Sequence, residues 1–266
     1  MTGWQELGDG VFRRRYESLD LNVGAVIGAG GVLIVDTRAS HRQARELVRE
    51  LKLLTDLPVR RVVNTHFHWD HCWGNALFGD AEIWGHRRCR EVLVERGEDV
   101  KAAMIDQSRP AQAEEFGEVQ IVPPDHLLTV SRSIDIGDRL VHLRHHGRGH
   151  TDSDITVTVA DCDVTFAGDL LEQGAPPSFG DSFPLDWPET LDGLLEIATG
   201  TIVPGHGDVV DRAFATTQRD QIAEMASMAR EAHANGASAE EVDVAHAPFP
   251  EPYARLALRR AISQLG

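Results

Sequence analysis

The heptapeptide at residues 65–71, Thr-His-Phe-His-Trp-Asp-His, constrains this chain most, because it places three imidazoles and one carboxylate within six positions. Residues 59–64 before it are rich in valine and predict a buried strand. On an extended chain His66 and His68 point to the same side and can bind one metal ion. Asp70 and His71 follow the turn and can face a second ion. Imidazole and carboxylate are ligands of zinc, or sometimes of iron or manganese.

Three more candidate ligands follow apolar segments further along the chain. His150 lies in a glycine-rich loop, and such glycines let the backbone bend tightly. Asp169 follows the apolar run that ends at Gly168, and a carboxylate can bridge two cations with its two oxygens. His206 stands between two glycines after a short apolar run. Asp36 also ends a predicted strand. There it could support the loop of residues 65–71, here called the metal loop, or simply cap a helix.

The sequence predicts alternating blocks of strands and helices. We expect one domain over residues 1–266, with a helical C-terminal tail at about 211–266. Residues 86–116 are expected to be largely helical, with interruptions at Gly97 and Pro110. The other predicted helices are 41–54, 187–199 and 211–234, and the predicted strands are 11–16, 21–27, 32–35, 59–64, 81–84, 119–122, 127–130, 140–143, 155–159, 164–167 and 201–204.

Composition restricts the partners. The formal net charge of −16 makes nucleic acid a poor partner, because the surface repels phosphates. No apolar run approaches the roughly 20 residues that span a bilayer, and the N-terminal residues lack the pattern of a signal peptide. The three cysteines, Cys72, Cys89 and Cys162, are odd in number and indicate a reducing compartment. We therefore expect a cytoplasmic protein with a small-molecule substrate, and its homo-oligomeric state stays open.

The chain resembles the metallo-β-lactamase superfamily through His66-x-His68-x-Asp70-His71 and three later motifs, over roughly residues 10–210. The later motifs are Gly149-His150-Thr151, Gly168-Asp169 and Gly205-His206-Gly207. The resemblance implies an α+β fold, a four-layer αββα sandwich, with a dinuclear site like that of glyoxalase II. It places His66, His68 and His150 on the first ion, Asp70, His71 and His206 on the second, and Asp169 between both. It implies two zinc ions per chain, with iron or manganese as alternatives, and Asp36 behind the metal loop.

The resemblance further implies a metal-dependent hydrolase that uses a metal-bridging hydroxide, with Asp70 orienting the nucleophile or moving a proton. We expect a small carboxylic ester, thioester or lactone as substrate. A β-lactamase is the less favoured alternative, because the zinc β-lactamases of the family usually lack an aspartate at the Asp169 position. A mononuclear iron persulfide dioxygenase, which would use His66, His150 and Asp169, and an inactive metal-binding or scaffold protein also stay open.

Aromatic residues near the ligands are candidates for the wall of a substrate pocket. Trp69 and Trp73 flank the metal-binding stretch, and Trp187 follows a proline-rich loop. Apolar rings commonly line small-molecule sites, and they also fill cores. One or more of the three could wall an apolar substrate pocket, and for any single one of them core packing is the more frequent role.

Overall fold

In the computed structural model, which describes residues 3–266, twelve strands pair into one hydrogen-bonded sheet with two halves. The halves are joined at one residue pair, Leu21 with His206. The first half contains β1 (Trp4–Gly8), β2 (Val11–Tyr16), β3 (Leu21–Gly28), β4 (Gly31–Val35), β5 (Val59–Val63), β6 (Glu82–His86) and β7 (His126–Leu128). The second half contains β8 (Ser131–Asp135), β9 (Leu140–Arg144), β10 (Thr156–Val159), β11 (Val164–Glu172) and β12 (Thr201–His206).

The two halves of the sheet pack face to face through an apolar cluster. Val26 and Val35 come from the first half, and Val157 and Phe166 come from the second, all within this one cluster. The strands at its centre, such as β10 and β11, are buried along their whole length. Because both of its faces are buried, β10 contains only valine and threonine, and the threonine hydroxyls form hydrogen bonds inside the protein.

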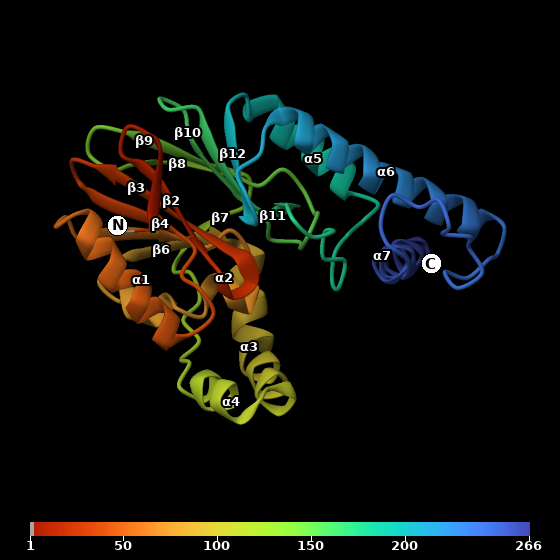
Figure 1. The fold of residues 1–266 in the computed structure, drawn as a ribbon, viewed down its shortest axis with the longest axis horizontal. Coiled ribbons are helices and arrows are strands. Elements are labelled where there is room, and N and C mark those ends of the chain that lie inside the picture. The colour runs from red at the N-terminus through yellow and green to blue at the C-terminus, as the bar shows by residue number, and fades with distance from the viewer. Residues whose placement is uncertain (1–2) are drawn as a thin grey trace.

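Helices cover the two outer faces (Figure 1). The helix α1 (His41–Leu54) begins at Ser40, whose hydroxyl accepts a hydrogen bond from the Gln43 amide, and it packs Leu47 and Leu51 on the first half. The helices α5 (Trp187–Ile197), α6 (Arg212–Ala234) and α7 (Glu251–Leu265) share an apolar cluster with β11 and β12. The order helix, sheet, sheet, helix confirms the predicted αββα architecture.

Two helices project from the body beneath the metal loop (Figure 1). They are α3 (Arg87–Gln107) and α4 (Pro110–Gly117). Pro110 begins α4, as expected for a proline in a first turn, but Gly97 does not interrupt α3. A Cβ atom at Gly97 would lie 3.0 Å from the Ile121 side chain, so the glycine allows the segment after α4 to pack closely on α3. Three short helices complete the described chain: η1 (Ser18–Asp20), α2 (Trp69–Cys72) and η2 (Asn75–Phe78).

Local differences from the sequence prediction have physical causes. The strand predicted at 119–122 is wrong, because Val119 and Ile121 pack irregularly on the cluster around Trp73, and Pro123 and Pro124 follow without amide donors. The strands β1 and β8 were not predicted, because both are short and polar and neither contains more than one buried residue. In residues 3–266 none of the helices combines the length and apolarity needed to cross a membrane.

Candidate metal centre

The metal loop connects β5 to α2 and is fixed to its neighbours through the backbone. The Asp36 amide donates to Val63 O, and the Ile155 amide donates to Thr65 O, so both halves of the sheet hold this loop. His66 lies in the loop and His68 precedes α2. The change from strand to helix separates this pair from Asp70 and His71, which lie on α2.

The other candidate ligands reach the same place from the second half of the sheet. His150 lies in the loop between β9 and β10, and His206 ends β12. Asp169 lies in β11 directly after Gly168, whose φ of 55° breaks the regular pairing with β12. The seven residues predicted as ligands from the sequence therefore come together.

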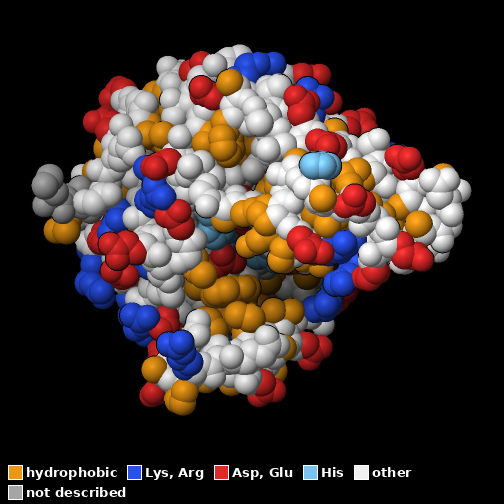
Figure 2. Space-filling view, turned by 45° about the vertical axis from the view of Figure 1, so that its right-hand side comes forward, with side chains coloured by type: hydrophobic (Ala, Val, Ile, Leu, Met, Phe, Trp, Pro, Cys, Tyr) orange, Lys and Arg blue, Asp and Glu red, His pale blue; other side chains and the backbone are white. Residues whose placement is uncertain are grey.

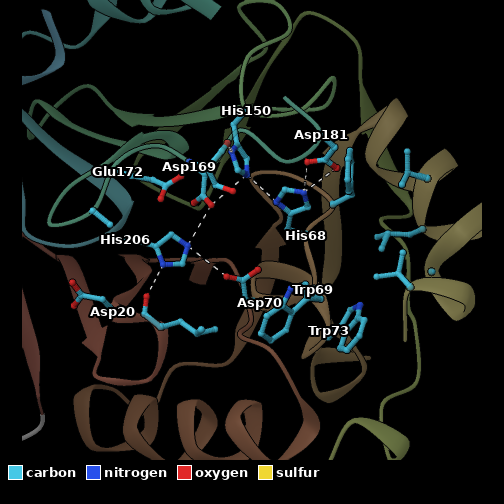
Figure 3. A pocket seen from close by; sticks show the side chains of 18 of the residues that line it. Asp20, His68, Trp69, Asp70, Trp73, His150, Asp169, Glu172, Asp181 and His206 are labelled. Carbon is cyan, nitrogen blue, oxygen red and sulfur yellow. Dashed lines mark hydrogen bonds and ion pairs between the residues drawn. The ribbon is translucent and has the colours of Figure 1, made fainter. Parts of the chain in front are cut away.

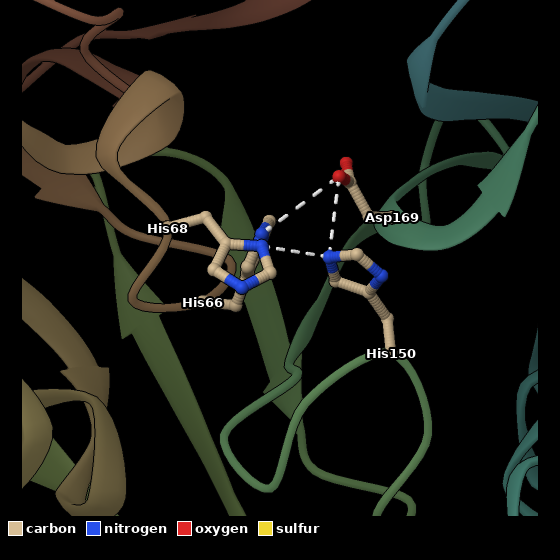
Figure 4. Close-up of side chains that lie close together, drawn as sticks. All are labelled: His66, His68, His150 and Asp169. Atoms are coloured by element: carbon tan, nitrogen blue, oxygen red, sulfur yellow. Dashed lines mark hydrogen bonds and ion pairs between the residues drawn. The ribbon is translucent and has the colours of Figure 1, made fainter. Parts of the chain in front are cut away.

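The first group consists of His66, His68, His150 and Asp169 (Figure 4). His68 Nδ1 lies 2.8 Å from His150 Nε2. Asp169 Oδ2 lies 3.4 Å from His150 Nε2 and 3.8 Å from His66 Nε2. One potential ligand atom from each residue lies within 4.8 Å of the others, which is compact enough for a single cation.

The second group consists of Asp70, His71 and His206. His71 Nε2 lies 3.3 Å from His206 Nε2, and Asp70 Oδ2 lies 3.5 Å from the same His206 atom (Figure 3). Asp169 contacts this group as well, since its Oδ1 lies 3.2 Å from His71 Nε2 and its Oδ2 lies 3.3 Å from His206 Nε2. Asp169 therefore lies between the two groups.

Each of the five imidazoles uses one ring nitrogen towards its group and has the other nitrogen beside an oxygen acceptor. The outward nitrogens can therefore carry the protons, which leaves the lone pairs of the inward nitrogens for a cation. The outward contacts are His66 Nδ1 with Thr65 Oγ1 at 3.1 Å, His68 Nε2 with Asp181 Oδ1 at 3.1 Å, His71 Nδ1 with Asp36 Oδ2 at 2.8 Å, His150 Nδ1 with Ser178 O at 3.2 Å and His206 Nδ1 with Leu19 O at 2.7 Å.

Two buried polar atoms at the centre of the cluster indicate the missing partner. Within residues 3–266, His66 Nε2 and Asp169 Oδ1 are buried and make no hydrogen bond; Asp169 Oδ1 faces His71 Nε2 at 3.2 Å, but the proton of His71 is placed on Nδ1 beside Asp36. Buried polar atoms in folded proteins are normally satisfied, so an atom left free at such a position indicates an absent water, ion or ligand. The donor set of imidazole and carboxylate fits divalent transition metals, and the residues present therefore fit the predicted cations.

The protonation preferences of the histidines differ even within the first group, where burial acts to lower the pKa of His68 but the Asp181 carboxylate outweighs it and raises that pKa. Burial lowers the pKa of His66, and it lowers the pKa of His150 to about 4, so both imidazoles are neutral at neutral pH. Burial acts in the same direction on His206, but the Asp169 carboxylate outweighs it and raises the pKa of His206 to about 10. A cation that binds the second group must therefore displace a proton.

Asp36 supports the metal loop as the resemblance implied. Its carboxylate accepts hydrogen bonds from the Thr65 amide and hydroxyl at 2.8 Å each, and its Oδ2 also lies 2.8 Å from His71 Nδ1. Asp36 is buried and has a φ of 66°, a conformation that aspartate tolerates better than most residues. One carboxylate therefore fixes both the loop and one imidazole.

Sequence reasoning did not identify a second supporting carboxylate, Asp181. The proline-rich loop after β11 brings Asp181 to His68 and brings the Ser178 carbonyl to His150. The Glu172 carboxylate accepts a 2.8 Å hydrogen bond from the Ser178 amide and thereby anchors the loop. The Gly180-Asp181 pair marked this segment as a loop in the sequence, but nothing there indicated its contact with the histidines.

A cavity of about 580 Å³ opens beside the two groups. Figure 2 shows it as a hollow with apolar side chains around its opening and histidine and acidic atoms within. Trp69 and Trp73 line the cavity, as expected, together with Phe67. The expectation for Trp187 is wrong, because this side chain is fully buried behind His150 and its indole donates to Leu170 O. Trp187 belongs to the core because α5 packs it against the sheet.

Residues 19–206 match the family model of the metallo-beta-lactamase superfamily. The chain belongs to this superfamily. The match contains the metal loop and every strand end that carries a candidate ligand. The superfamily expected from the sequence motifs is therefore confirmed.

The relatives of this member of the metallo-β-lactamase superfamily include an alkylsulfatase and metallo-beta-lactamases. The chain is 24% identical over 235 residues to a linear primary-alkylsulfatase of Pseudomonas sp. (strain ATCC 19151), a match that covers 76% of this chain and 43% of the alkylsulfatase. It is 22% identical over 189 residues to a metallo-beta-lactamase type 2 of Bacillus cereus, covering 69% of this chain and 66% of the relative. These relatives are metal-dependent hydrolases, which is the enzyme class predicted from the sequence.

Solved structures show the same fold. The stereoselective inverting sec-alkylsulfatase Pisa1 from Pseudomonas sp. has a TM-score of 0.80 at 17% identity over 98% of this chain, and the match covers 50% of that protein. A metallo-beta-lactamase from Pontibacter korlensis has a TM-score of 0.65 at 18% identity, covering 83% of this chain and 98% of its own. The chain spans about half the length of the alkylsulfatases it matches.

Proposed function

We propose that this protein is a hydrolase with two zinc ions that cleaves a small carboxylic ester, thioester or lactone. The observation that carries the proposal is the convergence of five inward imidazole nitrogens on two carboxylates, with every outward nitrogen already beside an acceptor. His66, His68 and His150 would hold one ion, and Asp70, His71 and His206 the other. Asp169 would contact both, because its two oxygens face both groups.

Bound cations would supply a hydroxide nucleophile at neutral pH and positive charge for the developing oxyanion. The residues of the chain have supporting tasks. Asp36 and Asp181 hold His71 and His68 in orientation, and the buried Asp169 offsets part of the positive charge. Asp70 borders the cavity and is the candidate for orienting the nucleophile or moving its proton.

The cavity supports a substrate with an apolar part. Phe67, Trp69 and Trp73 line it on the side of the metal loop, and residues of α3 continue this surface. Apolar walls with a few convergent polar groups are typical of small-molecule sites. A carboxylic ester or thioester with an apolar acyl group satisfies both parts of the cavity.

Hydrolysis of an alkyl sulfate is the second candidate. It is supported by the sequence similarity to the linear primary-alkylsulfatase and by the same apolar wall, which could take an alkyl chain. The two candidates differ at the bond cleaved, because one enzyme would break the bond from an acyl carbon to oxygen or sulfur, and the other would break the ester linkage between an alkyl group and sulfate. Matched substrates therefore separate them.

The test combines metal analysis with one substrate panel. We would measure metals by mass spectrometry in protein purified without added metal, for the wild type, Asp169→Asn and Asp169→Ala. The panel would contain 4-nitrophenyl butyrate, a butyryl thioester, γ-nonalactone, hexyl sulfate and nitrocefin. We expect the wild type to contain about two zinc ions per chain and to hydrolyse the ester, the thioester or the lactone. Both Asp169 variants should contain less zinc, and their turnover of the same substrate should be lower by at least about a hundredfold.

Other outcomes decide between the alternatives. Turnover of hexyl sulfate alone would establish the second candidate, and turnover of nitrocefin alone would indicate a lactamase. One iron per chain, together with oxygen consumption in a separate assay with an added persulfide, would overturn the hydrolase proposal in favour of a dioxygenase. A protein that binds no metal even after reconstitution would fit the inactive scaffold.

A further inference from the structure

The wall of the cavity opposite the metal groups is built by one face of α3. Val92, Leu93, Arg96, Gly97 and Val100 all line the cavity, and their spacing places them on one side of the helix. Arg96 lies one turn from Val92 and one turn from Val100. Its aliphatic stem can therefore extend along the apolar surface while its guanidinium remains in contact with water.

This wall is rigid because aromatic rings pack beneath it. The Trp69 ring lies 5.9 Å from the Trp73 ring, and both rings lie 5.4 Å from the Phe116 ring of α4. Trp73 and Phe116 are almost completely buried, and Leu93 belongs to the same apolar cluster. Such a wall is formed before a ligand arrives, so little conformational entropy is lost when an apolar group binds.

The charges that line the cavity are distributed unevenly. Asp20 accepts a hydrogen bond from Arg15 Nη2 at 2.8 Å, and Asp181 pairs with His68. Glu172 accepts from the Ser178 amide, while Asp70 and Asp169 belong to the metal groups. Each lining carboxylate therefore has a partner within the described chain.

Arg96 differs from these carboxylates. It is the single Lys or Arg side chain among the residues that line the cavity, and within residues 3–266 it makes no hydrogen bond or ion pair. The ion pairs found on α3 within residues 3–266 leave Arg96 out, because Arg87 and Arg88 pair with Glu91 and Lys101 pairs with Glu98. A guanidinium on the wall of an apolar cavity, without a carboxylate partner, is suited to bind an oxyanion of a ligand.

We propose that the substrate carries an aliphatic acyl chain with a carboxylate at its far end, and that Arg96 binds this carboxylate while the chain lies on the wall formed by Trp69, Trp73 and α3. This inference rests on the proposed hydrolase activity and names its substrate class, the half-esters and half-thioesters of aliphatic dicarboxylic acids. Arg96 is then a specificity-determining residue. The metal groups act at the ester or thioester end of the substrate, and Arg96 binds the carboxylate at the other end.

The test compares ester pairs that differ only at the terminal group. The anionic set is the mono-4-nitrophenyl esters of glutaric, adipic and suberic acid, and the neutral set is 4-nitrophenyl valerate, hexanoate and octanoate. The metal-loaded wild type would be compared with Arg96→Gln and with Arg87→Gln. Arg87 is a matched control, because it is exposed on the same helix, pairs with Glu91 and does not line the cavity.

We expect the wild type to prefer one anionic length over its neutral partner, and the Arg96→Gln variant to raise KM for that ester about three- to tenfold while kcat changes little. KM for the neutral partner should stay unchanged, and the Arg87→Gln variant should resemble the wild type. Added salt should raise KM for the anionic ester in the wild type and much less in the Arg96→Gln variant. The inference would be overturned if, at every chain length, the ratio of KM for the anionic ester to KM for the neutral ester were the same in the wild type, Arg96→Gln and Arg87→Gln.

A binding measurement separates this inference from the proposed function. The 4-nitroanilide analogues of the same acids resist hydrolysis, and their binding can be followed by quenching of tryptophan fluorescence, because Trp69 and Trp73 line the cavity. Preferential binding of the anionic anilide that is lost in Arg96→Gln, without turnover of any ester, would refute the hydrolase and retain the recognition. Ester turnover without any anionic preference would retain the hydrolase and refute the role of Arg96.

Discussion

Asp181 lies beside His68 with both carboxylate oxygens, at 3.1 and 3.2 Å from Nε2, although 113 residues separate them in the chain. The opposite nitrogen of the same imidazole, Nδ1, faces His150 Nε2 at 2.8 Å. A carboxylate on the outward nitrogen fixes the tautomer and increases the basicity of the inward one. The loop after β11 therefore contributes to the first metal group without supplying a ligand.

Replacing Asp181 by alanine should weaken the binding of one of the two metal ions. We expect the affinity for that ion to fall about tenfold or more, with the free energy of unfolding of the metal-free protein nearly unchanged, because Asp181 is largely exposed. Competition with a fluorescent chelator measures the affinity. Asp20→Asn is the control: it also removes a negative charge from the cavity, and asparagine tolerates the φ of 57° found there. A similar loss in both variants would mean that charge alone matters.

Gly205 should be irreplaceable for a steric reason. A Cβ atom at this position would lie 1.8 Å from Asp169 Oδ1, so even alanine forces the carboxylate away from its place between the groups. We expect the Gly205→Ala variant to bind less than two metal ions per chain and to lose turnover, which metal analysis and the ester assay would measure. The Gly180→Ala variant, where a Cβ would meet nothing within 4 Å, should bind metal normally.

Trp187 should affect stability and leave substrate recognition unchanged. Phenylalanine at this position would remove the hydrogen bond from the indole to Leu170 O and leave a void beside Phe179, at a cost of about 1–3 kcal/mol in the free energy of unfolding. KM of the variant for the esters should stay within about twofold of the wild-type value, because Trp187 does not line the cavity. By contrast, Trp69→Ala should raise KM, because Trp69 lines the cavity. Urea unfolding and steady-state kinetics would measure the two effects.

His86 should make the protein less stable in acid. Burial, followed by the nearby His145, lowers the pKa of His86 to about 4, below the value of about 6.5 in an unfolded chain. The unfolded state therefore binds a proton first as the pH falls. Stability from this residue is complete above pH 6.5, declines towards pH 4, and by pH 5 has decreased by about 2 kcal/mol.

The variant His86→Asn tests this pH dependence. Asparagine can keep the cap of α3, where His86 Nδ1 accepts from the Arg88 amide, and it does not titrate. The difference in unfolding free energy between wild type and variant should shrink between pH 7.5 and pH 5. Loss of metal in acid affects both proteins, so the difference isolates His86. A constant difference would contradict the assignment.

The sequence by itself identified the seven candidate ligands, and the family resemblance carried by those motifs implied the order of the layers. His66, His68, Asp70 and His71 are adjacent in the chain, and a strand followed by a helix turns them into two pairs through local geometry alone. His150, Asp169 and His206 were recognisable because glycines accompany them at the ends of apolar runs. The helix at 41–54 was predicted correctly because its cap and its apolar face are both local signals.

Only the tertiary structure decided which other residues support the site. Asp181 reaches His68, and Arg96 reaches the cavity, through loops and helices whose packing depends on distant contacts. Trp187 and Trp69 are both tryptophans near ligands, yet one fills the core and the other lines the cavity, because burial depends on what packs around a side chain. Periodicity and glycine spacing record local conformation, whereas the contacts that select orientation and substrate arise between segments far apart in the chain.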